Sequence, residues 1–235
     1  MSNAVIKPVR VAVFGSYYQG NAVVDKILEL QRQNPEAVRL VGVATDDPTH
    51  PRVSPERRIW QFVTDKREYV MVPEKAASND VSVWNGSVKK DDFYRLFAEE
   101  WRPDICYMAT FGQRVPMPVF DFPRFGFYNF HPAVDRTWPS YVGGNPFKGM
   151  IDAKEPHCSI AMHSIDEEFD HGPLVAFSEH VPIGANDTIL SMYLKTCPAT
   201  ADMVHWHLGE LKIVPPYNNY KPKLAPSDEA AMQVA

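Results

Sequence analysis

The 235-residue chain is poor in cysteine, in long apolar runs and in positive charge, and each shortage excludes a class of protein. Its three cysteines stand far apart without a Cys-x-x-Cys pair, so we expect free thiols and a cytoplasmic location. No window holds the roughly 18 apolar residues that a membrane-spanning helix needs, so we expect no membrane partner. A formal net charge of -5 argues against a general nucleic-acid binder, and we expect no DNA partner.

Several common catalytic and cofactor motifs are also missing. The chain has neither a serine nucleophile elbow nor a phosphate-loop lysine motif. Tyr17, Tyr18 and Gln19 separate the two glycines that follow the first apolar run, so no dinucleotide fingerprint is formed. What remains is an ordinary globular composition, 45% hydrophobic and 23% charged, with enough residues for one large domain or two small lobes.

Short apolar runs predict the central part of the fold. Runs near residues 11–15, 40–44, 105–109 and 126–130 are typical of strands buried on both faces. The first two are joined by a helix that Asn21 can cap, and such a strand-helix-strand unit favours a parallel crossover. We therefore predict an α/β fold with a mostly parallel central sheet flanked by helices.

Weaker patterns complete the prediction. We expect short strands at 70–72 and 81–84, a helix from Asp91 or Asp92 to Trp101, a helix at 146–152, antiparallel strands at 159–165 and 174–177, a helix from Asp187 to Leu208 capped by Asn186 or Asp187, and loops at 46–48 and 51–58. Residues 1–210 should form the catalytic domain. Residues 211–235 should form an extended or disordered tail, because they are rich in proline and poor in apolar residues.

An amide, an imidazole and a carboxylate stand where strands are expected to end. Asn129 and His131 follow an apolar run and share one face of a strand, and Asp170 lies in an acidic loop. These groups suit acyl transfer, which needs donors for a developing oxyanion and a route for a proton. A lone histidine is usually structural, and a metal set of His131, Asp170 and His171 is a further alternative.

The segment from Arg102 to Val181 resembles the folate-dependent formyltransferases, which include glycinamide ribonucleotide, methionyl-tRNA and amino-sugar N-formyltransferases. The resemblance lies in the Phe111–Pro116 run, the Asn129-x-His131-Pro132 motif and the Asp170-x-Gly172 turn. It implies a Rossmann-like formyltransferase fold and an enzyme that moves a formyl group from 10-formyltetrahydrofolate to a primary amine. It also implies catalytic roles for Asn129, His131 and Asp170.

The resemblance further implies a set of folate-binding residues, and we also expect a set of substrate-binding residues and no metal. The expected folate-binding residues are Phe111, Gln113, Arg114, Val115, Ile165, Asp166 and Asp170. The expected substrate-binding residues are Gly15, Ser16 and Tyr141. Backbone N–H groups near Gly15 and Ser16, at the start of a helix, can also cradle a phosphate.

The acceptor is less well indicated. Val142 stands where many members of the family have a basic residue, and residues 135–137 are extra relative to the family pattern. The methionyl-tRNA members carry an added C-terminal domain, for which this chain offers no length. We therefore expect a small-molecule amine, first an amino-sugar nucleotide, with glycinamide ribonucleotide and methionyl-tRNA as alternatives and a homo-oligomer left open.

An interpretation from another class also stays open. A non-catalytic α/β nucleotide-binding module could contain the same polar residues as buried structural groups. The enzyme interpretation requires an open cleft where Asn129, His131 and Asp170 meet, whereas the module interpretation allows them to be sealed inside the fold.

Overall fold

The computed structural model describes residues 7–46, 48, 59–217 and 220–225. Its strands are β1 (Val9–Gly15), β2 (Val38–Ala44), β3 (Ser82–Trp84), β4 (Ile105–Ala109), β5 (Phe127–Ala133), β6 (His157–Ser164), β7 (Leu174–Phe177), β8 (Val181–Pro182) and β9 (Lys223–Leu224). Its helices are α1 (Tyr17–Gln33), the 3-10 helix η2 (Ile59–Phe62), α2 (Arg67–Ala77), α3 (Asp91–Arg95), the π-helical turn η3 (Leu96–Trp101), α4 (Met117–Phe120), α5 (Pro146–Asp152) and α6 (Ile189–Glu210).

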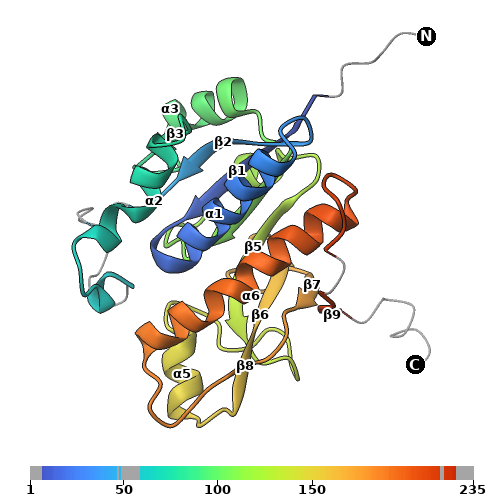
Figure 1. Cartoon of the computed structure of the whole chain (residues 1–235). Coiled ribbons are helices and arrows are strands. Elements are labelled where there is room, and N and C mark those ends of the chain that lie inside the picture. The colour runs from blue at the N-terminus through green and yellow to red at the C-terminus, as the bar shows by residue number, and fades with distance from the viewer. Residues whose placement is uncertain (1–6, 47, 49–58, 218–219, 226–235) are drawn as a thin grey trace.

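Within the described residues the strands form one nine-stranded sheet, in the order β3-β2-β1-β4-β5-β6-β7-β9, with β8 paired to β6 (Figure 1). From β3 to β5 every neighbouring pair is parallel. From β5 to β9 every pair is antiparallel. The predicted α/β fold, with a parallel part and an antiparallel strand pair toward the C-terminal half, is confirmed. Strand β5 is where the two kinds of pairing meet.

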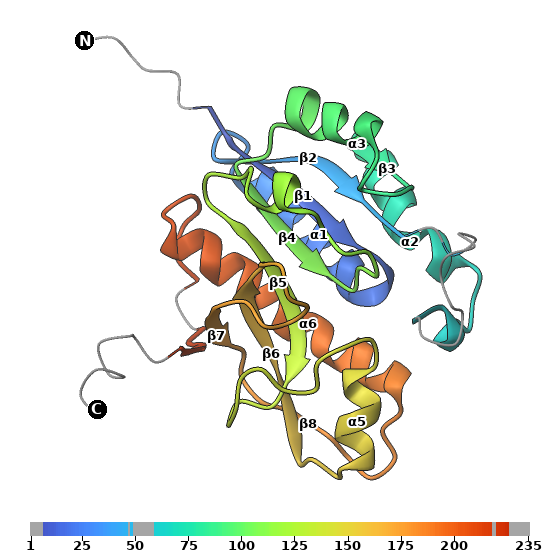
Figure 2. The ribbon, with the colours of Figure 1, turned by 180° about the vertical axis from the view of Figure 1, so that it is seen from behind.

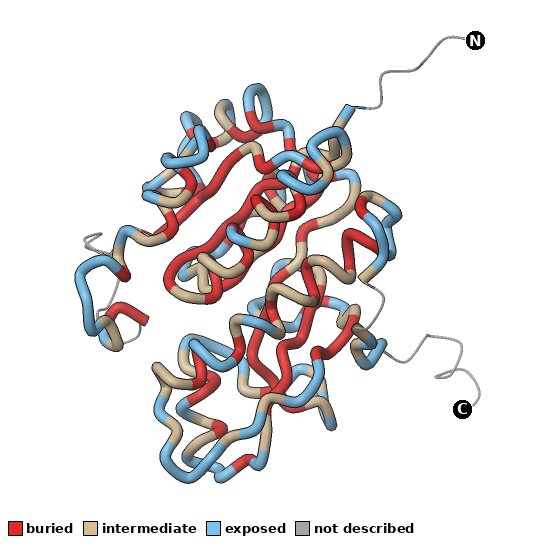
Figure 3. The backbone as a smooth tube through the Cα atoms, viewed as in Figure 1, coloured by how far each residue is buried: buried red, intermediate tan, exposed pale blue. Residues whose placement is uncertain are grey.

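Helices cover both faces of the sheet. Helices α1 and α6 lie side by side on one face, and α3 with η3 covers the other (Figures 1 and 2). Alternation along β1 matches this, because Val11 and Val13 pack in the first core cluster while Ala12 and Phe14 pack in the second. The central strands are accordingly buried over most of their length (Figure 3).

Three local predictions are wrong. Residues 70–72 lie inside α2, not in a strand, and Glu68, Val72 and Ala76 are buried at the four-residue spacing of one helical face. A short apolar run fits either element, and here packing against the sheet decides for a helix. Helix α1 begins at Tyr17 after Ser16, four residues before the predicted cap at Asn21.

Helix α6 also starts slightly later than predicted. Its N-cap is Thr188, whose side chain accepts a hydrogen bond from the Ser191 backbone N–H while the Ser191 hydroxyl accepts one from the Thr188 N–H. This reciprocal pair satisfies two N–H groups that a helix start otherwise leaves unpaired, so it outcompetes a cap at Asn186 or Asp187.

Other predictions concern the chain's periphery. The predicted helix at 146–152 is confirmed, and Cys106, Cys158 and Cys197 are free thiols, as expected. Residue 47 and the predicted loop at 51–58 lie outside the described residues, as do residues 226–235. Within the predicted tail, β9 pairs with β7, and the division at residue 210 stays a prediction. Among the described helices, none combines the length and the apolar character needed to cross a membrane.

Candidate active site

Strand β5 places Asn129 and His131 at the junction of the parallel and antiparallel halves of the sheet. Asn129 lies beside Met108 of β4 on one side and opposite His163 of β6 on the other. The sequence-based prediction that both residues stand at the end of a strand is wrong. The strand runs on to Ala133, so both side chains project from inside it. Both are nearly covered, with 6% of Asn129 and 5% of His131 exposed.

The carboxylate of Asp170 joins these two side chains. Its Oδ1 accepts a hydrogen bond from Asn129 Nδ2 at 3.0 Å and lies 3.5 Å from His131 Nδ1. Its Oδ2 accepts a hydrogen bond from the Gly143 backbone N–H at 3.2 Å. The three residues predicted to act together therefore converge on one carboxylate.

The residue two positions after Asp170 must be glycine for a steric reason. A Cβ at Gly172 would stand 1.8 Å from the carbonyl oxygen of Ser164, at the end of β6. No side chain fits there, so the loop that carries Asp170 can close against β6 only with glycine at this position.

His163 belongs to the same cluster, although it was not among the predicted site residues. Its Nδ1 lies 2.8 Å from the Ser164 carbonyl oxygen, which can only accept, so Nδ1 carries the proton. Its Nε2 then accepts from Asn129 Nδ2 at 3.0 Å. Burial lowers the pKa of His163 to about 4, which keeps the ring neutral and suited to orienting the Asn129 amide.

His131 carries its proton on Nε2, whereas His163 carries its proton on Nδ1. Its Nε2 lies 3.0 Å from the Tyr141 carbonyl oxygen and therefore donates to it, which leaves Nδ1 facing Asp170. Burial lowers the pKa of His131, while the Asp170 charge and the carbonyl oppose that shift. A proton taken up at Nδ1 would lie between the imidazole and the carboxylate, as a proton relay needs.

A second set of hydrogen bonds fixes the Tyr141 backbone, whose carbonyl orients His131. The Tyr141 hydroxyl donates to Glu155 Oε1 at 2.5 Å, and the Arg136 guanidinium donates two hydrogen bonds to the same carboxylate. These hydrogen bonds lower the pKa of Glu155 to about 2. Tyr141 has a left-handed backbone, with a φ of 51°. Arg136 and Glu155 thus hold its side chain, and with it the carbonyl that contacts His131.

A pocket opens beside this cluster, between the loops that follow β4 and β6. Its empty space, counted together with the open solvent at its mouth, is about 350 Å³. Its lining residues are Met108, Gln113, Arg114, Val115, Asn129, His163, Ile165, Asp166, Glu167, Glu168, Phe169 and Asp170. Asn129 and Asp170 are therefore not sealed inside the fold, which is the arrangement that the enzyme interpretation requires.

Most of the predicted folate-binding residues line this pocket. Gln113, Arg114 and Val115 come from one loop, and Ile165, Asp166 and Asp170 come from the other. Phe111 is the exception. Its ring packs against Phe14 in the core, with centroids 5.6 Å apart, and it is not a lining residue.

The three predicted substrate residues lie outside the pocket lining. The Ser16 hydroxyl is buried, lies 3.1 Å from Thr45 Oγ1 and accepts from the Asp46 backbone N–H at 3.0 Å. A Cβ at Gly15 would come within 2.8 Å of Gly20 Cα, so the glycine permits a close approach of the chain. The roles of Gly15, Ser16 and Tyr141 toward a substrate stay predictions.

The alternative metal set of His131, Asp170 and His171 does not form. The exposed His171 directs Nδ1 toward the Phe169 carbonyl oxygen at 2.5 Å. Among the residues that the structure describes, the three side chains within reach of one ion are Asp135, His157 and His180, in another part of the molecule.

Comparison with known proteins places the chain in a family. The family model described as formyl transferase matches residues 9–204. The chain belongs to this formyl transferase family. The resemblance inferred from the residue motifs is thereby confirmed.

The curated relatives are similar over part of their length. The chain is 36% identical over 87 residues to a methionyl-tRNA formyltransferase of Ralstonia nicotianae, covering 37% of this chain and 25% of that protein. It is 28% identical over 133 residues to a methionyl-tRNA formyltransferase of Aromatoleum aromaticum, covering 57% of this chain and 41% of that protein. The matched segments thus span less than half the length of these relatives.

Solved structures share the fold over nearly the whole chain. A phosphoribosylglycinamide formyltransferase from Bacillus halodurans superposes with a TM-score of 0.62 at 19% identity, covering 90% of this chain and 98% of that one. A sugar N-formyltransferase from Shewanella gives a TM-score of 0.60 at 20% identity, covering 92% of this chain and 73% of that one. At these identities the likeness establishes the fold.

Proposed function

We propose that this chain transfers a formyl group from 10-formyltetrahydrofolate to the primary amine of a small acceptor, first an amino-sugar nucleotide. The observation that carries the proposal is the convergence of Asn129, His131 and Asp170 beside a pocket. The walls of that pocket are the two loops that the family resemblance assigns to the folate. A merely structural polar cluster has no need of an adjoining opening.

The pocket residues suit the flat, partly apolar ring system of a folate. Phe169 is 55% exposed, although it lines the pocket together with Val115 and Ile165. An exposed aromatic ring in a pocket is a surface that an apolar ligand can cover. Arg114 donates to the Glu167 carbonyl oxygen, so the two loops that would hold the donor are tied to each other.

The polar cluster can perform the two tasks of formyl transfer. Attack of the amine nitrogen on the formyl carbon makes a tetrahedral oxyanion, for which the Asn129 amide is the available donor. Both of its N–H groups are engaged, one by His163 and one by Asp170, so a reacting oxygen would replace the Asp170 contact. His131 Nδ1 accepts the amine proton while Asp170 stabilises the imidazolium that results.

Collapse of this intermediate completes the reaction. The bond between the formyl carbon and the folate nitrogen breaks, and the proton held at His131 passes to that nitrogen. The products are the N-formyl amine and tetrahydrofolate, and His131 returns to its neutral form, which burial favours.

The rim of the pocket favours a small amine over a long polyanion. Glu167 and Glu168 are exposed lining residues, and Asp166 adjoins them. Their charges repel the many phosphates of a polynucleotide laid across the opening more strongly than the few phosphates of a small nucleotide. Methionyl-tRNA is the second candidate acceptor, since the curated relatives carry that name.

A transfer assay tests the proposal. Tetrahydrofolate release from 10-formyltetrahydrofolate is followed with an amino-sugar nucleotide, glycinamide ribonucleotide or methionyl-tRNA as acceptor, and the N-formyl product is identified by mass spectrometry. We expect release that depends on one acceptor, and saturable binding of a stable folate analogue. Absence of analogue binding at millimolar concentration would instead favour the nucleotide-binding module.

A further inference from the structure

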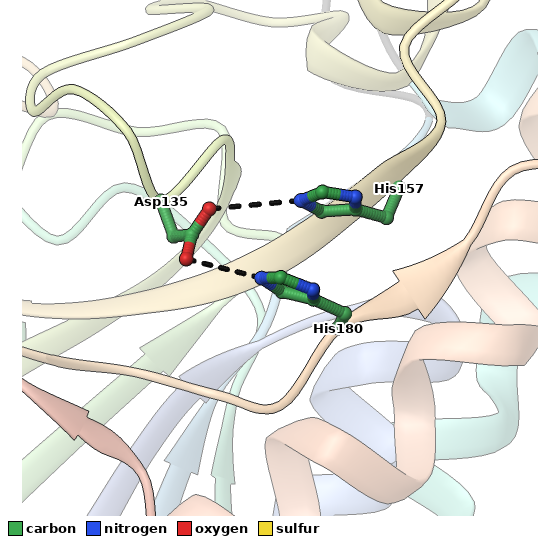
Figure 4. Close-up of side chains that lie close together, drawn as sticks. All are labelled: Asp135, His157 and His180. Carbon is green, nitrogen blue, oxygen red and sulfur yellow. Dashed lines mark hydrogen bonds and ion pairs between the residues drawn. The ribbon is translucent and has the colours of Figure 1, made fainter.

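Three potential metal ligands meet away from the pocket, each on a different segment. Asp135 lies in the loop after β5, His157 begins β6, and His180 lies between β7 and β8 (Figure 4). The carboxylate points between the two rings, with Oδ1 3.6 Å from His157 Nε2 and Oδ2 3.0 Å from His180 Nε2. All three ligand atoms lie within 4.8 Å of one another.

These spacings suit one tetrahedral ion. Bonds of about 2.0–2.1 Å from zinc to nitrogen and oxygen put two ligands of a tetrahedral site about 3.3–3.4 Å apart. The two observed carboxylate–imidazole separations lie on either side of that value, 3.0 Å from Oδ2 to His180 and 3.6 Å from Oδ1 to His157. Two imidazoles with one carboxylate are also a set that zinc and its first-row neighbours prefer over magnesium or calcium.

The competing explanation is a cluster of ion pairs without any metal. Lys223 Nζ lies 3.1 Å from Asp135 Oδ2 and 3.2 Å from the Asp135 carbonyl oxygen. The two histidine rings stack with centroids 3.7 Å apart and planes inclined by 17°, so their ring lone pairs point along nearly parallel planes. An ion therefore requires one ring to turn and the ammonium to move away.

The two groups that must move are the exposed ones. The side chains of His180 and Lys223 are 53% and 60% exposed, whereas those of Asp135 and His157 are 17% and 27% exposed. Rotation of an exposed imidazole and withdrawal of an exposed ammonium meet little steric opposition. Asp135 and His157, which are less exposed, can stay in place and supply two of the ligands.

We propose that Asp135, His157 and His180 form a binding site for a divalent first-row transition ion of the zinc class, with water completing the coordination. None of these residues lines the pocket or contacts the Asn129–His131–Asp170 cluster. Bound there, the ion ties the loop after β5 to β6 and to the segment before β8. The same loop supplies the Tyr141 carbonyl that contacts His131 and the Gly143 N–H that contacts Asp170.

Titration of the full chain with metal tests the site without any enzymatic assay. Chelator-treated protein is titrated with Co²⁺, followed by its visible absorption, and with Zn²⁺, followed by calorimetry. We expect one equivalent to bind, with affinity reduced at least tenfold in His157→Gln and in His180→Gln. His205→Gln, a substitution outside the cluster, is the matched control and should bind like the unaltered protein.

Lys223→Met separates the two explanations. Removing the competing ammonium should tighten Co²⁺ binding severalfold if the site holds an ion. If the cluster is only a set of ion pairs, the same change leaves the protein without metal affinity. Absence of stoichiometric binding, or binding that survives both histidine substitutions in folded protein, would overturn the proposal. Either result leaves the formyl transfer proposal untouched, because the transfer assay is separate.

Discussion

Replacing Asp170 by asparagine keeps the shape of the side chain and removes its charge, which makes it a stringent test of the cluster. The carboxylate accepts a hydrogen bond on each oxygen, from Asn129 Nδ2 at 3.0 Å and from the Gly143 N–H at 3.2 Å. An amide has one accepting oxygen. Asp170→Asn must therefore turn an NH₂ group toward one of these two donors and lose that hydrogen bond.

The structure sets the size of the effect. Loss of one hydrogen bond to a charged group costs about 1.5–3 kcal/mol, so the free energy of unfolding should fall by at most that amount. Catalysis should suffer more. The Asp170 charge opposes the burial that lowers the pKa of His131, so in the proposed mechanism it would help Nδ1 to accept the amine proton. Loss of that proton transfer should lower turnover by about 10²–10⁴-fold.

The sign of the pH effect follows from the same contacts. Without the Asp170 charge, only the backbone hydrogen bonds still oppose the effect of burial, and the pKa of His131 falls further below its ordinary value. The limb of the pH–rate profile that reports His131 should therefore move to lower pH. Tetrahydrofolate release measured across pH with saturating acceptor reads out both effects. Near-native turnover with an unshifted profile, in folded Asp170→Asn protein, would refute the assignment.

Three further predictions test other parts of the account. Asn129→Ala should lower turnover by about 10²–10³-fold as an oxyanion donor is lost, and its effect should be less than additive with Asp170→Asn in a double mutant. The hydrogen bonds of Glu155 lower its pKa to about 2. Its contribution to stability should therefore be present above about pH 4.3 and disappear toward pH 2, and urea unfolding of Glu155→Gln across this range measures it. Gly172→Ala should destabilise the fold by about 1–3 kcal/mol or more, measured by thermal unfolding, because its Cβ would stand 1.8 Å from the Ser164 carbonyl oxygen.

Each of these predictions has its own contrary outcome. Strictly additive losses in the Asn129 and Asp170 double mutant would show that the two groups work independently. If Glu155→Gln loses as much unfolding free energy on acidification as the unaltered protein does, the pKa of this carboxylate does not differ between the folded and unfolded states. Gly184→Ala is the steric control for Gly172, since a Cβ there meets Asp187 at an ordinary 3.5 Å, and equal effects at both glycines would contradict the steric argument.

The strand pattern and the family motif were enough to predict that Asn129, His131 and Asp170 lie together. Alternation along a strand puts residues 129 and 131 on one face, and both side chains do reach Asp170. The parallel core could be predicted for a similar reason, since its apolar runs are long enough to specify buried strands. Helix α2 was not predictable in this way, because residues 70–72 are equally compatible with a strand.

The contacts of His163 and of Glu155 could not be predicted from the sequence, for a different reason. His163 contacts Asn129 through the register of β5 against β6, which pairs the two residues across the strands. Register depends on tertiary packing, so it cannot be read from either strand alone. The Tyr141–Glu155 hydrogen bond likewise depends on how the loop after β5 folds back toward the end of α5. Local sequence carries no signal for that contact.

A single assay that measures both products of formyl transfer tests most directly whether the cluster carries out the reaction. With its true amine, the unaltered protein should release tetrahydrofolate and form the N-formyl product in equimolar amounts. Folded Asn129→Ala protein should form both about 10²–10³-fold more slowly while still binding a folate analogue. Formation of the two products at a near-native rate by Asn129→Ala would contradict the account, because the reaction would then not depend on the cluster where Asn129, His131 and Asp170 meet.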